Sequence, residues 1–287
     1  MHTQSPSASP DFEKTLAAVN NCYSDEFQLY LPKPVDFENG EIIDKDNKFY
    51  RSVYLRIKAI NQIQLARDSF KEIDLKSVWQ KISESIKLIP SKAIVSSIGS
   101  QGFLSIPLFK YDLDMTKFEF IRLHIWDKSI DEVVNRYAAT NFSIHNHMFQ
   151  ANSWILCGKI LNDRFKVYPS DNESPYSYFA IDYNKTLNQI NQHTSTAYRT
   201  NTFALVKQIS HEEYFQKGTY NIRAGDFHKS GANDAGVSAT LFSFTADNNF
   251  QGKPSSVIGP SSVQSSEINR KMFFDPTELI LEIDKKI

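Results

Sequence analysis

The sequence has little cysteine, no excess of positive charge and no long apolar run. Two cysteines in 287 residues cannot form a disulfide framework or a cysteine-rich zinc site, so we expect a fold stabilised by packing, with reduced thiols. The 32 basic and 33 acidic residues leave a net charge of −1, which argues against nucleic-acid binding. No run approaches the roughly 18 apolar residues of a membrane helix, and Met1 to Asp11 lack the features of a secretory signal. We therefore expect a soluble, cytoplasmic protein without nucleic-acid or membrane partners.

Several well-known catalytic motifs are also absent. The chain contains no G-x-G-x-x-G, no G-x-x-x-x-G-K-[ST] and no G-x-S-x-G, so neither a nucleotide-binding loop nor a nucleophile elbow is predicted. Cys157 lies in an apolar run beside Gly158, which is typical of a buried, inert thiol rather than of a nucleophile. Candidate functional residues must therefore be of other types.

The first third of the chain has a helical pattern. Residues 1–12 are polar and carry two prolines, which predicts a disordered tail. Over residues 13–92, apolar residues recur at three- and four-residue spacing, most clearly in two stretches that meet near Asp74. We therefore predict an N-terminal helical extension that contains two amphipathic helices.

The pattern changes near residue 93 to short runs of β-branched and aromatic residues separated by turn residues. In the clearest run, Phe118–Trp126, the side chains of Arg122, His124 and Trp126 share one face. Further strands are expected at Ser153–Ile160, Arg164–Tyr168, Tyr178–Tyr183, Thr202–Ile209, Gly218–Ile222 and Val237–Thr245. So many short strands predict an all-β sandwich or barrel.

The predicted barrel covers residues 93–250 and includes an insertion near residues 170–200. Residues 251–287 are expected to form a C-terminal loop and a short helix from Pro276 to Lys285, because Ser, Gly and Pro dominate the sequence up to about Ser266.

Two histidines separated by one residue are the first candidates for chemistry. On a strand, residues i and i+2 point to the same side, so His145 and His147 could share a metal ion. A turn at Gly225–Asp226 leads into His228, which could supply a third nitrogen. The alternative is that all three are solvated surface histidines. Three imidazoles suit octahedral iron with up to three open positions, and equally tetrahedral zinc with one bound water.

These residues resemble the motifs of the cupin superfamily. The first motif of that superfamily is His-x-His, followed usually by a Glu and then by a Gly. In this chain His145 and His147 are followed by Ala151 at the position of the Glu and by Gly158 at the expected position of the Gly. Its second motif, Gly-x-x-His, matches the stretch Gly225–His228. The resemblance implies a double-stranded β-helix, or jelly-roll, barrel with a metal at its mouth. Because the three histidines must converge, we expect one barrel rather than two domains.

Within cupins, the chain is most similar to thiol dioxygenases of the cysteine-dioxygenase type, which bind Fe(II) through three histidines and no carboxylate. A strand ending in Trp126 precedes Ser143–His147, as in that family, and a helical N-terminal portion is shared. The resemblance implies Fe(II) at His145, His147 and His228.

Two departures from that family concern the substrate. The family's Ser-x-His-x-Tyr strand corresponds to Ser238, Thr240 and Phe242, so only the serine is kept. The cysteine that can crosslink to the family's tyrosine corresponds to Asn152, so no crosslink can form. Both changes argue against cysteine itself as the substrate.

The strand that contains Arg122 and His124 is expected, by the resemblance, to line the pocket. His124 is a candidate for a catalytic acid or base or for a fourth metal ligand, and the alternative is a histidine of the core. Arg122 is a candidate for binding a substrate carboxylate, and the alternative is an exposed residue at the end of the strand. The expected pocket residues are Trp126, Asn152, Trp154, Ser238, Thr240 and Phe242. Both tryptophans suit the core as well as a pocket wall.

We therefore expect an Fe(II)-dependent cupin dioxygenase that acts with O₂ on a small polar, thiol- or amino-acid-like substrate. The first alternative is a cupin that uses zinc, manganese or nickel for a non-redox lyase or isomerase reaction. The second is a metal-free cupin that only binds a ligand or a partner protein. A homodimer is allowed, because cupins often dimerise.

Overall fold

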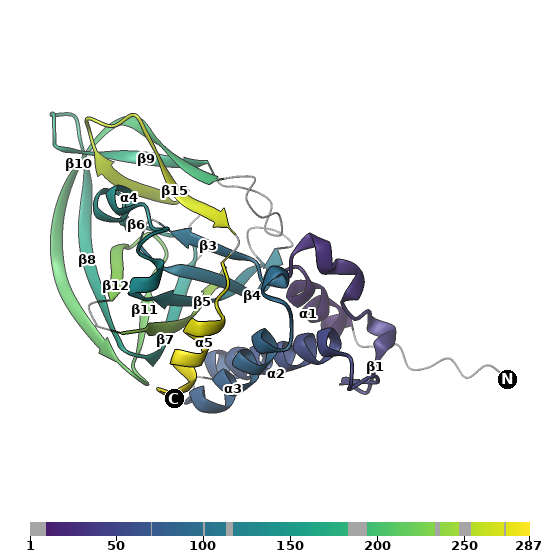
Figure 1. The fold of residues 1–287 in the computed structure, drawn as a ribbon. Helices are drawn as coiled ribbons and strands as arrows, with labels where there is room; N and C mark the ends of the chain where they lie inside the picture. Colours follow the sequence, from purple (N-terminus) through teal and green to yellow (C-terminus); the bar gives the residue numbers. More distant parts are fainter. Residues whose placement is uncertain are drawn as a thin grey trace.

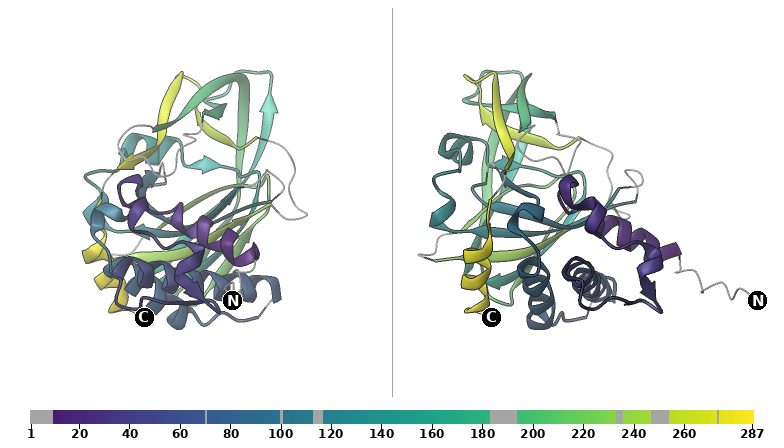
Figure 2. Two further views of the ribbon diagram at one scale, coloured as in Figure 1. Left: turned by 90° about the vertical axis from the view of Figure 1, so that its right-hand side faces the viewer. Right: turned by 45° about the vertical axis from the view of Figure 1, so that its right-hand side comes forward.

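The computed structural model of the chain describes residues 10–69, 71–99, 101–112, 117–182, 194–232, 236–246, 254–272 and 274–287. The helices of the N-terminal third gather at one end of the molecule, and strands form most of the rest, together with the short helices labelled α4 and α5 (Figures 1 and 2). No helix within the described ranges is long and apolar enough to cross a membrane.

The predicted helical extension is present. Its main helices are α1 (Pro10–Asn20), α2 (Lys48–Ser69) and α3 (Leu75–Lys87). Between them lie the 3-10 helices η1 (Asp25–Tyr30) and η2 (Pro34–Asp36) and the small hairpin of β1 (Phe37–Glu38) and β2 (Glu41–Ile42), and η3 (Ser91–Ala93) follows α3. The predicted junction is confirmed, because the Asp74 side chain caps α3 by accepting a hydrogen bond from the Ser77 backbone N–H at 3.0 Å.

The predicted tail of residues 1–12 is too long. Residues 10–12 already belong to α1, because Pro10 suits a first helical position and Asp11 lies in the first turn, where a negative charge favours the helix. Residues 1–9 lie outside the described residues.

The strands of the barrel follow in chain order. They are β3 (Ser96–Gly99), β4 (Leu104–Asp112), β5 (Phe118–Trp126), β6 (Ile144–His145), β7 (Gln150–Cys157), β8 (Lys159–Ser170), β9 (Tyr176–Asp182), β10 (Thr194–Phe215), β11 (Thr219–Ile222), β12 (Phe227–Ala232), β13 (Ser238–Thr245), β14 (Ser256–Pro260) and β15 (Ser265–Met272). The short helices η4 (Lys128–Ile130) and α4 (Arg136–Asn141) connect β5 to β6, and α5 (Thr277–Asp284) follows β15.

All neighbouring strands pair antiparallel, in the order β11-β7-β13-β5-β4-β3-β15-β10-β8-β12-β6-β14-β9, with an additional pairing of β9 and β10. Side chains from distant strands of this order, such as Phe242 of β13 and Ile160 of β8, meet in one interior cluster, so the sheet closes on itself. The structure therefore has the predicted mainly β barrel with an N-terminal helical extension.

Alternation along β13 separates the interior of the barrel from a second core. Phe242 and Phe244 point into the interior cluster, whereas Ala239 and Leu241 join a cluster that includes residues of the helices. The helices therefore cover the outer face of the sheet and leave its inner face for the barrel.

The predicted C-terminal loop is wrong in its central part. The segment contains β14, which pairs with β6 and β9, and β15, which pairs with β3 and β10. Val257 and Ile258 are buried by these pairings, and this burial outweighs the turn-like Ser, Gly and Pro composition. The predicted C-terminal helix is present as α5, and the described part of the predicted insertion near 170–200 forms β9 and the start of β10.

Candidate metal centre

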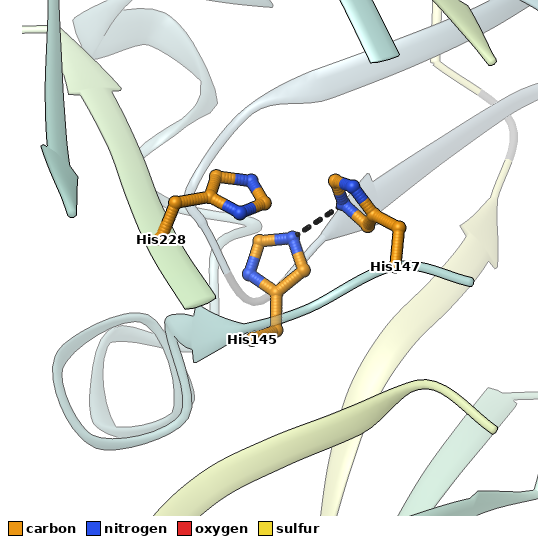
Figure 3. Close-up of side chains that lie close together, drawn as sticks. All are labelled: His145, His147 and His228. Carbon is orange, nitrogen blue, oxygen red and sulfur yellow. Dashed lines mark hydrogen bonds between the residues drawn. The ribbon is translucent and has the colours of Figure 1, made fainter. Parts of the chain in front are cut away.

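His145, His147 and His228 converge inside the barrel from segments far apart in the sequence. His145 of β6 lies opposite His228 of β12 in an antiparallel pair, and His147 follows two residues after β6. The ligand atoms of the three side chains all lie within 4.8 Å of one another. Figure 3 shows the three rings turned toward one another.

A glycine turn holds His228 beside His147. Gly225 has a φ of +86°, a left-handed conformation that favours glycine, and its backbone N–H donates to the His147 carbonyl at 2.7 Å. The same turn is closed by the Asp226 backbone N–H, which donates to the Arg223 carbonyl at 3.1 Å. The glycine of the Gly-x-x-His motif therefore has a structural role, because its hydrogen bond holds the start of β12 against the segment that carries the other two histidines.

Hydrogen bonds set which ring nitrogen faces the centre. His145 Nδ1 donates to the Ser143 carbonyl at 2.9 Å, and His228 Nδ1 lies 3.4 Å from the Asp226 carbonyl. These contacts leave the Nε2 lone pair of each ring for another partner. His145 Nε2 lies 2.9 Å from His147 Nε2. This distance fits a hydrogen bond in which one of the two rings carries the proton on Nε2, and it fits equally two nitrogens that face one metal ion.

The three imidazoles are neutral at ordinary pH. Burial lowers the pKa of His145 to about 4. Burial, together with the neighbouring His228, holds the pKa of His147 well below its usual value, and burial with His145 does the same for His228. Neutral imidazole is the form that binds a metal. The described ligand group contains no Asp, Glu or Cys, so the donor set is three neutral nitrogens.

His124 of β5 lies near His145 and His147, on the face of the strand that it shares with Trp126. Its ring is stacked against Phe103 and Phe242, with centroid distances of 4.1 and 4.9 Å. It is 4% exposed, and its Nε2 is buried with no hydrogen-bond partner among the described residues. Burial, the Arg122 charge and His145 all lower its pKa well below the usual value, so this ring is also neutral. His124 does not belong to the group of converging ligand atoms.

Arg122 places a positive charge next to the site. Its guanidinium carbon lies 4.8 Å from the ring centroid of Phe120 and 4.9 Å from that of Phe244. The Phe244 ring in turn contacts His147, with a centroid distance of 4.6 Å. The Arg122 charge contributes to the lowered pKa values of His145 and His147. A cation beside a neutral donor set favours an anionic ligand.

The other predicted pocket residues divide between the two faces of the sheet. Trp126 and Phe242 belong to the interior cluster, and Thr240 lies opposite His124 in the pairing of β13 with β5. Ser238 is fully buried, and its Oγ accepts a hydrogen bond from the Lys159 backbone N–H at 3.3 Å, so it supports the turn between β7 and β8.

The structure corrects the placement of Asn152 and Trp154. Ala151 and Ile155 of β7 point into the barrel, so Asn152 and Trp154 point outward. Both line a groove of about 1530 Å³ between the outer face of the sheet and the connection of α2 to α3. Sequence alone could not settle this alternation, because apolar residues occupy both faces at the end of β7.

Sequence reasoning missed three residues around the centre. Gln101, in the turn between β3 and β4, places its Nε2 within 3.3 Å of both ring nitrogens of His145. Phe103 and Phe244 contact His124 and His147 respectively. Gln101 belongs to no motif and to no periodic pattern in the sequence, so nothing in the sequence marked it as a residue of the site. Phe244 could have been found from its alternation with Phe242 along β13.

Comparisons with known proteins add little to this description. No profile of a protein family matches the chain, and no curated protein matches it. Among solved structures, procruciferin, an 11S globulin from Brassica napus, aligns with 7% identity and a TM-score of 0.29 over 55% of this chain and 31% of its own. The coconut allergen cocosin aligns with 7% identity and a TM-score of 0.30 over 57% of this chain and 35% of its own.

A third solved structure is the hydroxypropylphosphonic acid epoxidase from S. wedmorenis, with 8% identity and a TM-score of 0.28 over 68% of this chain and 96% of its own. This chain thus spans about a third of procruciferin and of cocosin, and nearly all of the epoxidase. At these TM-scores the likenesses carry no argument about the fold or the activity of this chain.

Proposed function

We propose that the protein is an Fe(II)-dependent oxygenase that acts on a small polar substrate, with His145, His147 and His228 as the metal ligands. The observation that supports the proposal is the convergence of three neutral imidazoles within 4.8 Å, with no carboxylate in the described group. When bound, Fe(II) supplies redox chemistry with O₂ at the coordination positions that three ligands leave open. Thiol-like and amino-acid-like compounds are the proposed substrates.

In this proposal Arg122 binds the substrate through a carboxylate. Its guanidinium lies near Phe244, which contacts His147, so an acid held there lies close to the metal ligands. His124 is neutral and presents a buried Nε2 without a partner among the described residues, so it orients the substrate by a hydrogen bond. Phe103 and Phe242 hold this ring between them and keep water from its faces.

A second candidate is a non-redox lyase or isomerase with zinc, manganese or nickel. It is favoured by the same donor set, because three protein nitrogens and one open position are typical of catalytic zinc. Zinc would supply a Lewis acid in place of redox chemistry.

Metal analysis and oxygen uptake test these candidates together. We expect the protein, purified without added metal, to contain about one iron ion per chain. We also expect the iron-loaded protein to consume O₂ in the presence of at least one compound from a panel of thiols, amino acids and aromatic acids. Stoichiometric zinc without O₂ uptake would support the lyase or isomerase. A protein that binds no metal under any loading would refute both enzymatic proposals and leave ligand or partner binding.

Replacement of His124 by glutamine tests the orienting role. We expect His124→Gln to lower kcat at least about tenfold while the iron content stays unchanged, because the variant loses a positioned imidazole but no metal ligand. The measurements are steady-state O₂ consumption and metal analysis of the same sample. Unchanged turnover would remove His124 from the mechanism.

A further inference from the structure

The outer groove that contains Asn152 and Trp154 is a second cavity, on the opposite face of the sheet from the metal centre. Its volume of about 1530 Å³ exceeds the roughly 300 to 1,000 Å³ of an ordinary small-molecule pocket, so the groove suits an elongated ligand. The neighbouring Ala151 points into the barrel, where the three histidines lie. The thickness of the sheet therefore separates a ligand in the groove from the metal centre.

Uncharged polar side chains of neighbouring strands form the floor of the groove. Tyr220 of β11 points into the barrel, so Asn221 beside it points outward. Asn221 lies opposite Asn152 of β7 in an antiparallel pair, which places the Cβ atoms of the two residues roughly 4.5 to 5.5 Å apart on one face. Gln150 of β7 and Thr245 of β13 also line the groove and lie opposite each other, one row away.

The amides of Asn152 and Asn221 are open to a ligand. Neither side chain has a hydrogen-bond partner in the part of the chain that the structure describes, and neither residue is fully buried. Each amide offers two N–H donors and one carbonyl acceptor in a single plane. Because both residues are on paired strands, little backbone freedom is lost when a ligand binds to them. The floor can therefore exchange hydrogen bonds with groups that both donate and accept, as hydroxyl groups do.

The charges around the groove are balanced. The described lining contains five basic side chains, Arg67, Lys71, Lys76, Lys117 and Lys217, and four acidic side chains, Asp68, Glu72, Asp74 and Glu119, together with the C-terminal residue Ile287. Arg67 is paired with Glu119 at 2.6 Å and with Asp68 at 2.8 Å. A groove without an excess of either sign favours a neutral ligand over an anion or a cation.

The floor is the face of a central strand rather than a free strand edge. β7 pairs with β11 on one side and with β13 on the other. An extended peptide is typically bound by main-chain hydrogen bonds to a free edge, and β7 has no such edge to offer. The groups that β7 presents to the groove are its side chains, which favours a ligand that is recognised through hydroxyl groups.

We propose that the groove binds a neutral, linear carbohydrate, with Asn152 and Asn221 as hydrogen-bond partners of its hydroxyl groups. The hydroxyl groups of such a chain donate and accept hydrogen bonds as the two amides do, its length matches the large volume, and its lack of charge matches the balanced lining. This inference does not rest on the proposed metal centre.

An array of neutral linear glycans built from glucose, mannose, galactose, xylose or N-acetylglucosamine is the probe, and calorimetric titration gives the affinity. We expect the full chain to bind at least one of these glycans. Asn152→Ala and Asn221→Ala should each weaken that binding about tenfold, because each variant loses an amide that makes two hydrogen bonds. Gln208→Ala is the matched control and should bind as the native chain does, since Gln208 Nε2 donates to Asp163 Oδ1 at 2.9 Å, outside the groove.

Metal binding separates this site from the metal centre. Both asparagine variants should bind Co²⁺ as the native chain does, and the metal-free protein should bind the glycan with native affinity. Failure to bind any neutral glycan, a preference for charged glycans, or native affinity in both variants would overturn the proposal. Loss of glycan binding in the metal-free protein would also overturn it, by placing the carbohydrate at the metal centre. Failure to bind Co²⁺ would instead refute the metal centre and leave the groove proposal standing.

Discussion

Replacement of His228 by alanine is expected to abolish stoichiometric metal binding and to lower the affinity more than about 100-fold. His228 is 2% exposed and supplies one of the three converging nitrogens, so its loss leaves only His145 and His147. Removal of a direct ligand should cost more than the roughly 10- to 100-fold loss seen when an outer partner of a ligand is removed. The measurement is a Co²⁺ or Fe²⁺ titration followed by metal analysis.

Two controls accompany this prediction. His211→Ala removes a histidine on β10 whose Nδ1 is 2.6 Å from Asp163 Oδ1 at the surface, and it should bind metal as the native chain does. His228→Gln keeps the size of the buried side chain, so it separates loss of a ligand from loss of folding, which circular dichroism also checks. Full metal occupancy in a folded His228→Ala protein would show that the third ligand is misassigned.

Replacement of Gly158 by alanine is expected to destabilise the fold by about 2 to 5 kcal/mol. Gly158 has a φ of +75°, and a Cβ there would lie 2.1 Å from Ser238 Oγ and 2.8 Å from Ser238 Cα. The left-handed backbone costs about 1 to 2 kcal/mol for a residue with a side chain, and a close approach to buried atoms costs about 1 to 3 kcal/mol more. Urea denaturation gives the free energy of unfolding directly.

The matched control is Gly40→Ala. Gly40 has a φ of +77° and nothing within 4 Å of the added Cβ, so only the backbone term of about 1 to 2 kcal/mol applies. The double variant Gly158→Ala with Ser238→Gly should regain part of the loss, because two of the three clashing atoms are removed. Equal effects at Gly40 and Gly158 would contradict a rigid contact between the β7–β8 turn and β13.

Gly158 and Gly225 explain why the motif residues could be recognised from the sequence. Both have positive φ and both stand where the backbone closely approaches a neighbouring segment, Gly158 at Ser238 and Gly225 at His147. A residue with a side chain would have a strained backbone at either position, so glycine is favoured there. A glycine at a fixed spacing from a histidine can therefore be recognised from a short stretch of sequence. The histidines and these glycines could therefore be assigned from sequence.

Other parts of the site could not be predicted because their signals are not local. Asn152 and Trp154 were placed in the pocket, but the alternation of β7 turns them to the outer groove. Gln101 depends on a contact with a histidine 44 residues away. Strands β14 and β15 depend on pairing with β6, β9, β3 and β10, which overrides their own turn-like composition.

The sequence by itself determined the three histidines, the inner face of β5 with Arg122 and His124, and the division into a helical part and a β part. Each of these follows from spacing within a few residues, which backbone periodicity converts into a shared face. Only the tertiary structure decided which face of β7 meets the barrel, where the C-terminal segment pairs, and that Gln101 contacts His145. These features depend on contacts between segments far apart in the chain, and such contacts are fixed by the burial of the whole barrel rather than by any local run of residues.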